Sequence, residues 1–155
     1  MKTSLSRLSI TTQTKGKPGS LPFAQMANKI LGKNYELSLV FTTPKIAQKL
    51  NKTYRAKSYT PNVLAFPYSI KNGELILCLS VIKNSAKDFD MTYEEFLAYL
   101  VIHGMLHLKG FEHGSTMEDA EKKNCKFFNT QHYNHDAPHS NRNRHRHSDD
   151  TRRDF

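Results

Sequence analysis

The chain has 155 residues and a net charge of +9, with 23 Lys or Arg against 14 Asp or Glu. This length suggests one domain with room for a sizeable core. It holds no apolar run long enough to span a bilayer, and residues 1–10 lack the apolar region of a signal peptide, so we expect a cytoplasmic protein. Cys78 and Cys125 form no C-x-x-C pair and are expected to be buried or incidental thiols.

Positive charge is concentrated in the N-terminal part of the chain. Residues 1–60 carry eleven Lys or Arg and one acidic residue, Glu36, for a charge of +10. Residues 61–130 carry seven basic and nine acidic residues, for −2, and the remainder carries five Arg and four Asp, for +1. A basic surface attracts phosphate backbones over long range. Charge alone fits a solvated basic surface equally well.

Strands and helices alternate in the first half. We expect strands over 4–14 and 35–41, and helices over 21–31 and 44–55. Gly32 is a stop signal for the first helix. Thr43 can cap the second helix through its side-chain oxygen, and Pro44 fits the first helical position.

The second half begins with a predicted hairpin and continues with helices. We expect strands over 62–68 and 74–81, a polar connection over 84–90, a long helix that begins after Thr92, and a last helix over 117–128 whose Ala120, Phe127 and Phe128 face inward. Pro67 indicates that the third strand lies at a sheet edge, and Asn72-Gly73 is typical of a hairpin turn. Thr92 and Glu95 form a capping box. The element order predicts an α+β fold, a small mixed sheet of about four strands with helices packed on it.

The composition changes after Asn129. The remainder has almost no aliphatic residues and cannot bury enough surface to fold, so we predict a domain over 1–129 and a disordered tail over 130–155. The tail is rich in histidine and arginine: His132, His135, His139, His145, His147, Arg142, Arg144, Arg146, Arg152 and Arg153. Loose metal capture and RNA contact are possible functions for such a segment. We favour solvated disorder without a specific task.

Three histidines carry the strongest chemical signal. His103 and His107 stand four apart on the predicted long helix, so their side chains share one face. Gly110 can end this helix in the left-handed conformation and turn the chain so that His113 approaches the other two. Three imidazoles with a fourth position open form the coordination of a catalytic zinc. Zinc is the favoured ion, although nickel, cobalt or copper could bind the same ligands.

The helix resembles the zinc-binding helix of the H-E-x-x-H hydrolases, and the likeness predicts a zincin-like helix with two His ligands. In those enzymes a glutamate follows the first histidine and serves as general base. Here that position is Gly104, so a peptidase mechanism would lack its base. A bound metal can still lower the pKa of a water molecule toward neutrality.

The longer pattern from His103 to His113, H-G-x-L-H-L-x-G-[YF]-[DE]-H, resembles that of the YbeY-type rRNA maturation factors, a family of metal-dependent endoribonucleases. The likeness continues upstream, in Asn51, Tyr54 and Arg55, then in Pro61-Asn62-Val63-Leu64-Ala65-Phe66-Pro67 and Gly73-Glu74-Leu75. It covers roughly residues 35–128. The sequence departs from the family pattern at Pro61-Asn62, where the family has Thr-Asp, and at Ala65, where it has Ser.

The resemblance implies one zinc ion held by His103, His107 and His113 plus a water, with Arg55 as the catalytic arginine. It implies a single-strand-specific, metal-dependent endoribonuclease that acts in maturation of the 16S rRNA 3′ end and in ribosome quality control. The implied partners are the 16S rRNA precursor and the small ribosomal subunit. A guanidinium group can stabilise charge on a scissile phosphate. Two alternatives stay open: a zinc-dependent peptidase or other hydrolase, and a non-catalytic ribosome-assembly factor that zinc stabilises.

Overall fold

The computed structural model of the chain describes residues 7–132 and has one four-stranded sheet with helices packed on it. Its main elements are β1 (Leu8–Thr12), α1 (Phe23–Leu31), β2 (Glu36–Thr42), α2 (Pro44–Arg55), β3 (Val63–Ser69), β4 (Asn72–Cys78), α3 (Leu79–Ser85), the 3-10 helix η2 (Ala86–Phe89), α4 (Tyr93–Lys109) and α5 (Ser115–Phe127). The expected α+β fold with a small mixed sheet is confirmed.

The strand order is β1-β2-β4-β3. β1 pairs with β2 in parallel, β2 pairs with β4 in parallel, and β3 pairs with β4 antiparallel. The strand that contains Pro67 therefore lies at an edge of the sheet, as predicted, since an edge strand tolerates the missing donor.

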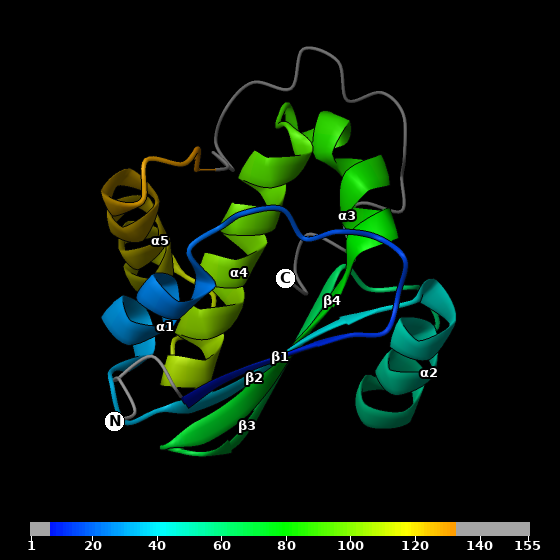
Figure 1. Cartoon of the computed structure of the whole chain (residues 1–155), viewed down its shortest axis with the longest axis horizontal. Coiled ribbons are helices and arrows are strands. Elements are labelled where there is room, and N and C mark those ends of the chain that lie inside the picture. Colours follow the sequence, from blue (N-terminus) through cyan, green and yellow to red (C-terminus); the bar gives the residue numbers. More distant parts are fainter. Residues whose placement is uncertain (1–6, 133–155) are drawn as a thin grey trace.

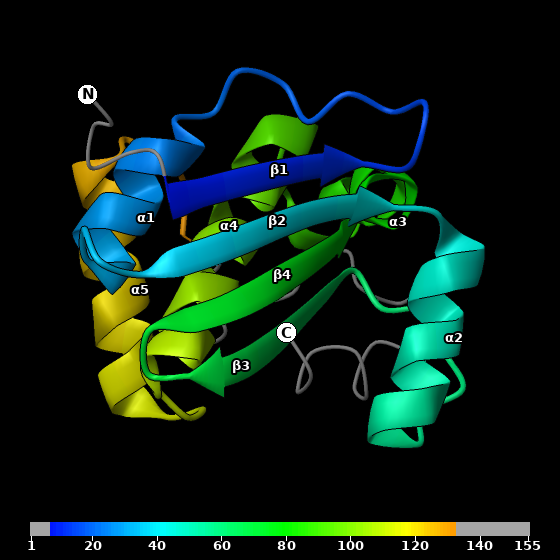
Figure 2. The same cartoon turned by 60° about the horizontal axis from the view of Figure 1, so that its bottom comes forward.

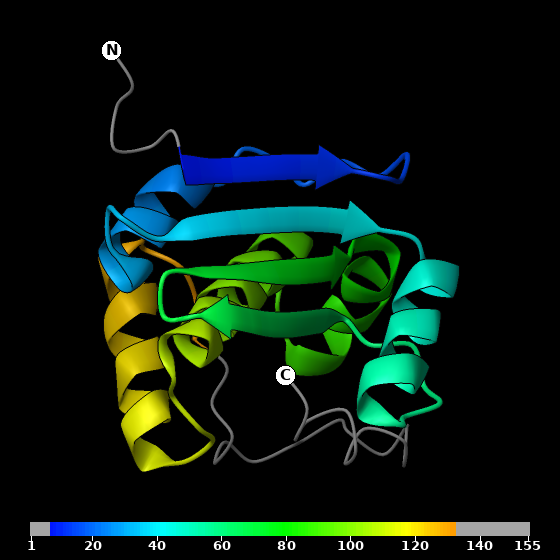
Figure 3. The same ribbon diagram turned by 90° about the horizontal axis from the view of Figure 1, so that it is seen from below.

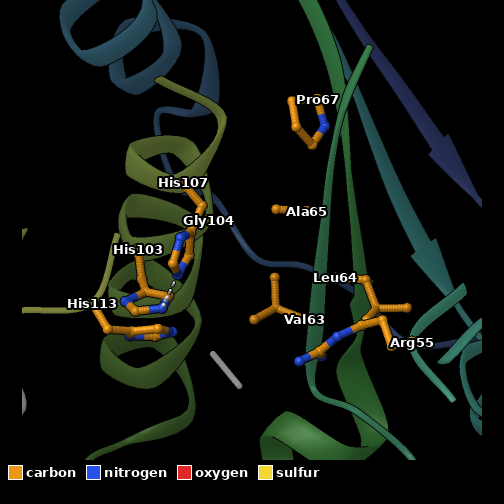
Figure 4. A pocket seen from close by; sticks show the side chains of 9 residues that line it. All are labelled: Arg55, Val63, Leu64, Ala65, Pro67, His103, Gly104, His107 and His113. Atoms are coloured by element: carbon orange, nitrogen blue, oxygen red, sulfur yellow. Dashed lines mark hydrogen bonds between the residues drawn. The ribbon is translucent and has the colours of Figure 1, made fainter. Parts of the chain in front are cut away.

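The sheet has one covered face. Helices α1, α4 and α5 lie over it, with α3 near one end (Figure 1). Helix α2 instead lies beyond the carboxyl ends of β2 and β4 (Figure 2). Seen from below, the opposite face of the sheet carries no helix within the described part of the chain (Figure 3). Helix α4 and the edge strand β3 therefore border the same space on the covered side of the sheet (Figure 4).

Helix α4 is the centre of the core. Twelve of its 17 residues are buried, on all sides of the helix, which is typical of a core helix rather than a surface helix. Its start is the predicted capping box: the Thr92 side chain accepts from the Glu95 N–H at 3.2 Å, and Glu95 accepts from the Thr92 N–H at 3.0 Å. Gly110 ends it with φ 111°, in the left-handed region. Both helix ends thus match their sequence signals.

The hairpin and the segment after it differ from the prediction. Ser69 pairs with Asn72, so the tight turn is Ile70-Lys71 and Asn72-Gly73 belongs to β4. The predicted strand over 74–81 ends at Cys78, because Leu79 begins helix α3. Leu79 and Ile82 are buried three residues apart, which is the helical period. An apolar run of this length fits the two-residue period of a strand as well as the helical period, and its packing in the tertiary structure selects the helix.

The last helix also needs a correction. α5 buries Met117, Glu121 and Cys125, whereas Phe127, expected to face inward, is 63% exposed. Ala120 and Phe128 pack against the core as expected. Both cysteines are free and buried, as expected of buried thiols.

Two further predictions concern membrane-spanning helices and the C-terminal tail. No helix among residues 7–132 has the length and apolarity needed to cross a membrane. The predicted tail over 130–155 lies outside the described residues from 133 onward. His132 is described, and its side chain is only 11% exposed.

Candidate metal centre

The first two histidines project from the C-terminal half of α4. His103 is buried, at 3% exposure, and His107 is half-buried. Gly104 between them allows the helix to approach the sheet, since a Cβ there would lie 2.7 Å from Leu75 Cδ2 and 3.5 Å from Val63 Cγ2. A glutamate here, as in H-E-x-x-H enzymes, would require the Leu75 side chain to shift. The position of the general base is thus taken up by close packing of the helix on the sheet.

The third histidine follows the helix end. Gly110 adopts φ 111° and Gly114 φ 152° on either side of His113, and left-handed backbone at these positions favours glycine. The reversal places the His113 ring 4.7 Å from the ring of His107 and 5.5 Å from that of His103, between centroids. One ligand atom from each of the three lies within 4.8 Å of the others. The predicted cluster is therefore present, and it could hold a metal ion.

The two helical imidazoles face each other through Nε2, at 3.0 Å. Two nitrogens bound to one tetrahedral zinc at about 2.0–2.1 Å lie about 3.3 Å apart, close to the observed separation. His107 Nδ1 lies 3.1 Å from the Phe111 carbonyl oxygen. This oxygen can only accept, so the neutral ring carries its proton on Nδ1 and a lone pair on Nε2.

The same reasoning applies to His103. Its Nδ1 lies 2.7 Å from Glu121 Oε2, and both side chains are 4% exposed. A carboxylate accepts, so Nδ1 donates and the neutral ring presents a second Nε2 lone pair to His107. Two facing lone pairs repel unless a proton or a metal cation lies between them. The nearby third imidazole, His113, favours the cation, because a proton needs no third ligand.

Glu121 on α5 is the outer partner of this cluster. Burial raises the pKa of the Glu121 carboxyl, but the hydrogen bond from His103, with the His132 and Tyr99 side chains nearby, lowers it to about 2. His132 Nε2 lies 3.8 Å from Glu121 Oε1, and its ring meets that of Tyr99 edge-on at 5.5 Å. A carboxylate behind a ligating histidine fixes the ring and raises its basicity.

The acid–base state of His107 suits ligation. Burial, together with the neighbouring His103 and His113, lowers the pKa of His107 to about 4. The ring is therefore neutral at pH 7, which is the form that binds a metal.

A cavity of about 280 Å³ opens beside the histidines. Its walls are the α4 cluster on one side and β3, with Arg55, on the other (Figure 4). The lining residues are Arg55, Val63, Leu64, Ala65, Pro67, His103, Gly104, His107 and His113. Among the described residues of this lining there is no Asp or Glu, so an anionic group meets cationic and apolar side chains from this part of the chain.

Arg55 reaches the cavity from the end of α2, past Leu64 (Figure 4). The helix ends there because Ala56 adopts the left-handed conformation, at φ 55°. Asn51, fully buried one turn earlier, accepts from Arg55 NH1 at 3.5 Å and donates to the Tyr59 carbonyl at 3.0 Å. The buried Asn51 amide thus positions both the Arg55 side chain and the loop that follows α2.

Two residues that depart from the family pattern, Ala65 and Asn62, lie in different environments. Ala65 lines the cavity, whereas Asn62 is 4% exposed and does not. The Asn62 carbonyl accepts from the Cys78 N–H at 2.9 Å. Asn62 therefore extends the pairing of β3 with β4 and does not belong to the cavity wall.

Glu121 is the member of this buried cluster that the sequence analysis missed. Its signal was present: Met117, Glu121 and Cys125 recur every four residues along one helix face. An acidic residue in such an apolar stripe indicates a buried partner. The partner itself lies 18 residues away and has no local signature.

The comparisons with known proteins agree with this geometry. The family model of Endoribonuclease YbeY matches residues 12–135. Two relatives are proteins named endoribonuclease YbeY. The one from Bdellovibrio bacteriovorus is 43% identical over 89 residues, which cover 55% of this chain and 58% of the relative. The one from Petrotoga mobilis is 35% identical over 100 residues, which cover 63% of this chain and 69% of the relative. The chain thus spans less than two thirds of the Bdellovibrio protein's length.

One solved structure supports the fold. The solution structure of TM1509 from Thermotoga maritima superposes with a TM-score of 0.57 at 24% identity, and the match covers 78% of this chain and 88% of that one. At this identity the likeness concerns the fold alone. The family model, in contrast, matches most of the sequence, and the motif residues lie within its span. The chain belongs to the endoribonuclease YbeY family.

Proposed function

We propose that this protein is a metal-dependent endoribonuclease, with one zinc ion held by His103, His107 and His113 and with Arg55 as the catalytic arginine. The observation that carries the proposal is the cavity itself, where three converging imidazoles face a guanidinium group and no carboxylate lines the space among residues 7–132. The names of the relatives point to the same reaction.

Each part of the site has a task in phosphodiester hydrolysis. A bound zinc ion supplies Lewis acidity, which lowers the pKa of a water molecule to near neutrality. The Arg55 guanidinium matches the fork geometry of phosphate oxygens and stabilises the charge that develops on the scissile phosphate. Asn51 holds Arg55 in place, and Glu121 holds His103 in the ligating tautomer.

The size of the cavity favours a single-stranded substrate. A volume of about 280 Å³ is at the lower end of small-ligand pockets, so it has room for a nucleotide and not for a duplex. Unpaired nucleotides can be splayed into such a pocket, whereas bases in a helix cannot. We propose the 3′ end of the 16S rRNA precursor as the substrate, in the cytoplasm and on the small ribosomal subunit, by extension from the family resemblance.

Peptide hydrolysis is the weaker candidate. It needs a general base, and the position of that base in H-E-x-x-H enzymes is occupied by Gly104 against Leu75. Casein hydrolysis that chelator abolishes would favour the peptidase.

The test is cleavage of RNA by protein of known metal content. Single-stranded and duplex RNA of the same sequence are incubated with wild-type protein, with and without chelator, and with the Arg55→Ala, Arg55→Lys and His107→Ala variants. Arg55→Ala is expected to slow cleavage about 10²–10³-fold, the effect of removing one donor to a developing oxyanion, and Arg55→Lys to restore part of it.

Arg7→Ala is the matched control. Arg7 is a half-exposed arginine on the opposite edge of the sheet, paired to Glu36 at 3.2 Å, and its removal should leave cleavage unchanged. RNA binding with metal bound but without cleavage would instead support the non-catalytic assembly factor. Cleavage that survives chelation and His107→Ala would contradict the proposed site.

A further inference from the structure

Two aromatic side chains from distant parts of the sequence meet on the surface. Tyr54 of α2 and Phe66 of β3 lie with ring centroids 5.5 Å apart and an interplanar angle of 67°. Tyr54 is 67% exposed and Phe66 is half-buried. We call these two residues the aromatic pair. Adjoining exposed aromatic side chains form a contiguous apolar patch, the kind of surface that marks interaction sites, unlike single scattered ones.

The aromatic pair adjoins the cavity along both of its segments. The cavity is lined by Arg55, Ala65 and Pro67, among others. Tyr54 directly precedes Arg55, and Phe66 lies between Ala65 and Pro67. Because side chains alternate along a strand, Phe66 points to the opposite side of β3 from Ala65 and Pro67. β3 is an edge strand. No other strand of residues 7–132 pairs with this edge. A chain that leaves the cavity over the edge therefore reaches the aromatic pair next.

Charge around the aromatic pair is unevenly distributed. Helix α2 carries exposed Lys45, Lys49 and Lys52 at one-turn spacing and has no acidic residue. No ion pair involves these lysines within residues 7–132. On the other flank, β4 places Glu74 opposite Phe66 in the sheet register, and this carboxylate disfavours a phosphate there. A polyanion is therefore directed along α2.

We propose that the aromatic pair stacks an unpaired base of RNA, one that neighbours the nucleotide held in the cavity. The inference rests on the proposed function in that RNA is the ligand. Ring faces bind bases of any identity by stacking, and the α2 lysines attract the phosphates on either side. The aromatic pair thereby sets the register of the strand over the metal centre and contributes to the preference for single strands, since a paired base offers no free face.

The test is binding of a labelled single-stranded RNA by fluorescence anisotropy, with a gel to confirm that the RNA stays intact. Tyr54→Ala is expected to weaken binding about 5- to 150-fold, the effect of removing one stacking residue. Tyr54→Phe keeps the ring and should bind within about twofold of wild type. Phe127→Ala is the control, because Phe127 is equally exposed, at 63%, but lies on α5, and it should bind as wild type does.

A second series locates the base. RNAs with one abasic nucleotide at successive positions should include one that weakens binding to the wild type while leaving Tyr54→Ala unaffected. Unchanged affinity in Tyr54→Ala, or an equal loss for every abasic RNA, would overturn the proposal and would leave the aromatic pair as a contact for a protein. Because the readout is binding, it is independent of cleavage: wild-type protein that binds RNA through Tyr54 without cutting it would refute the proposed function and not this inference.

Discussion

The replacement Glu121→Gln isolates the role of the buried carboxylate behind the metal centre. The Glu121 carboxylate lies 2.7 Å from His103 Nδ1, and both side chains are 4% exposed. Glutamine has nearly the same shape and keeps an oxygen that accepts from Nδ1, but it removes the negative charge that raises the basicity of His103 Nε2. The change therefore acts on metal affinity more than on folding.

The expected magnitude follows from comparable sites. Loss of a partner behind a ligating histidine weakens metal binding about 10–100-fold, or about 1.4–2.7 kcal/mol. The low exposure of the pair places the expected effect in the upper part of this range, because little water screens the charge. The assay is zinc titration in competition with a chelator of known affinity, with thermal unfolding of the metal-free proteins to show that both are folded.

Glu118→Gln provides the control. Glu118 lies on the same helix, is 25% exposed and pairs with Lys122 at 3.5 Å, so its charge contributes little to the metal centre. A Glu121→Gln protein that binds zinc as tightly as wild type, or a Glu118→Gln protein with an equal loss, would refute the reasoning that Glu121 positions His103.

The remaining predictions concern the fold around the cavity. Asn51→Ala should lower the free energy of unfolding by about 1–3 kcal/mol, because the fully buried Asn51 amide no longer donates to the Tyr59 carbonyl. Gln48→Ala, which removes an exposed bond, should cost under about 0.5 kcal/mol, and equal costs in urea unfolding would contradict this. Gly104→Glu should destabilise the fold by about 1–3 kcal/mol through contact with Leu75 and yield no casein hydrolysis; a stable, proteolytic variant would show the packing argument wrong. Burial lowers the pKa of His107 from 6.5 to about 4, so the unfolded chain binds this proton first and the metal-free protein should lose stability as pH falls from about 6.5 to about 4; a melting temperature just as pH-dependent in His107→Gln would contradict that assignment.

Much of the helix that carries the site could be predicted because its signals are local. The Thr92 capping box, the four-residue histidine spacing and the helix-ending Gly110 each depend on neighbours within one or two turns. The approach of His113 followed from the same glycine. Local chemistry thus determined the convergence of the three imidazoles.

The errors arose where two local signals competed or where the partner was remote. The run after Cys78 is apolar enough for a strand, and only burial of Leu79 and Ile82 selects the helix. The Asn72-Gly73 signal was overridden by the β3–β4 register, which places the turn at Ile70-Lys71. Glu121 was missed because its role depends on α5 packing beside α4, which no short window encodes.

Metal binding tests the central claim most directly. Metal-free protein is titrated with zinc, beside a variant in which His135, His139, His145 and His147 are replaced by alanine, so that loose binding by the C-terminal histidines is separated from the centre. The account predicts one tight zinc ion per chain in both proteins, lost in His107→Ala, together with RNA cleavage that returns as this one site fills. A tight ion that survives His107→Ala, or no tight ion in the protein with His103, His107 and His113 intact, would contradict it.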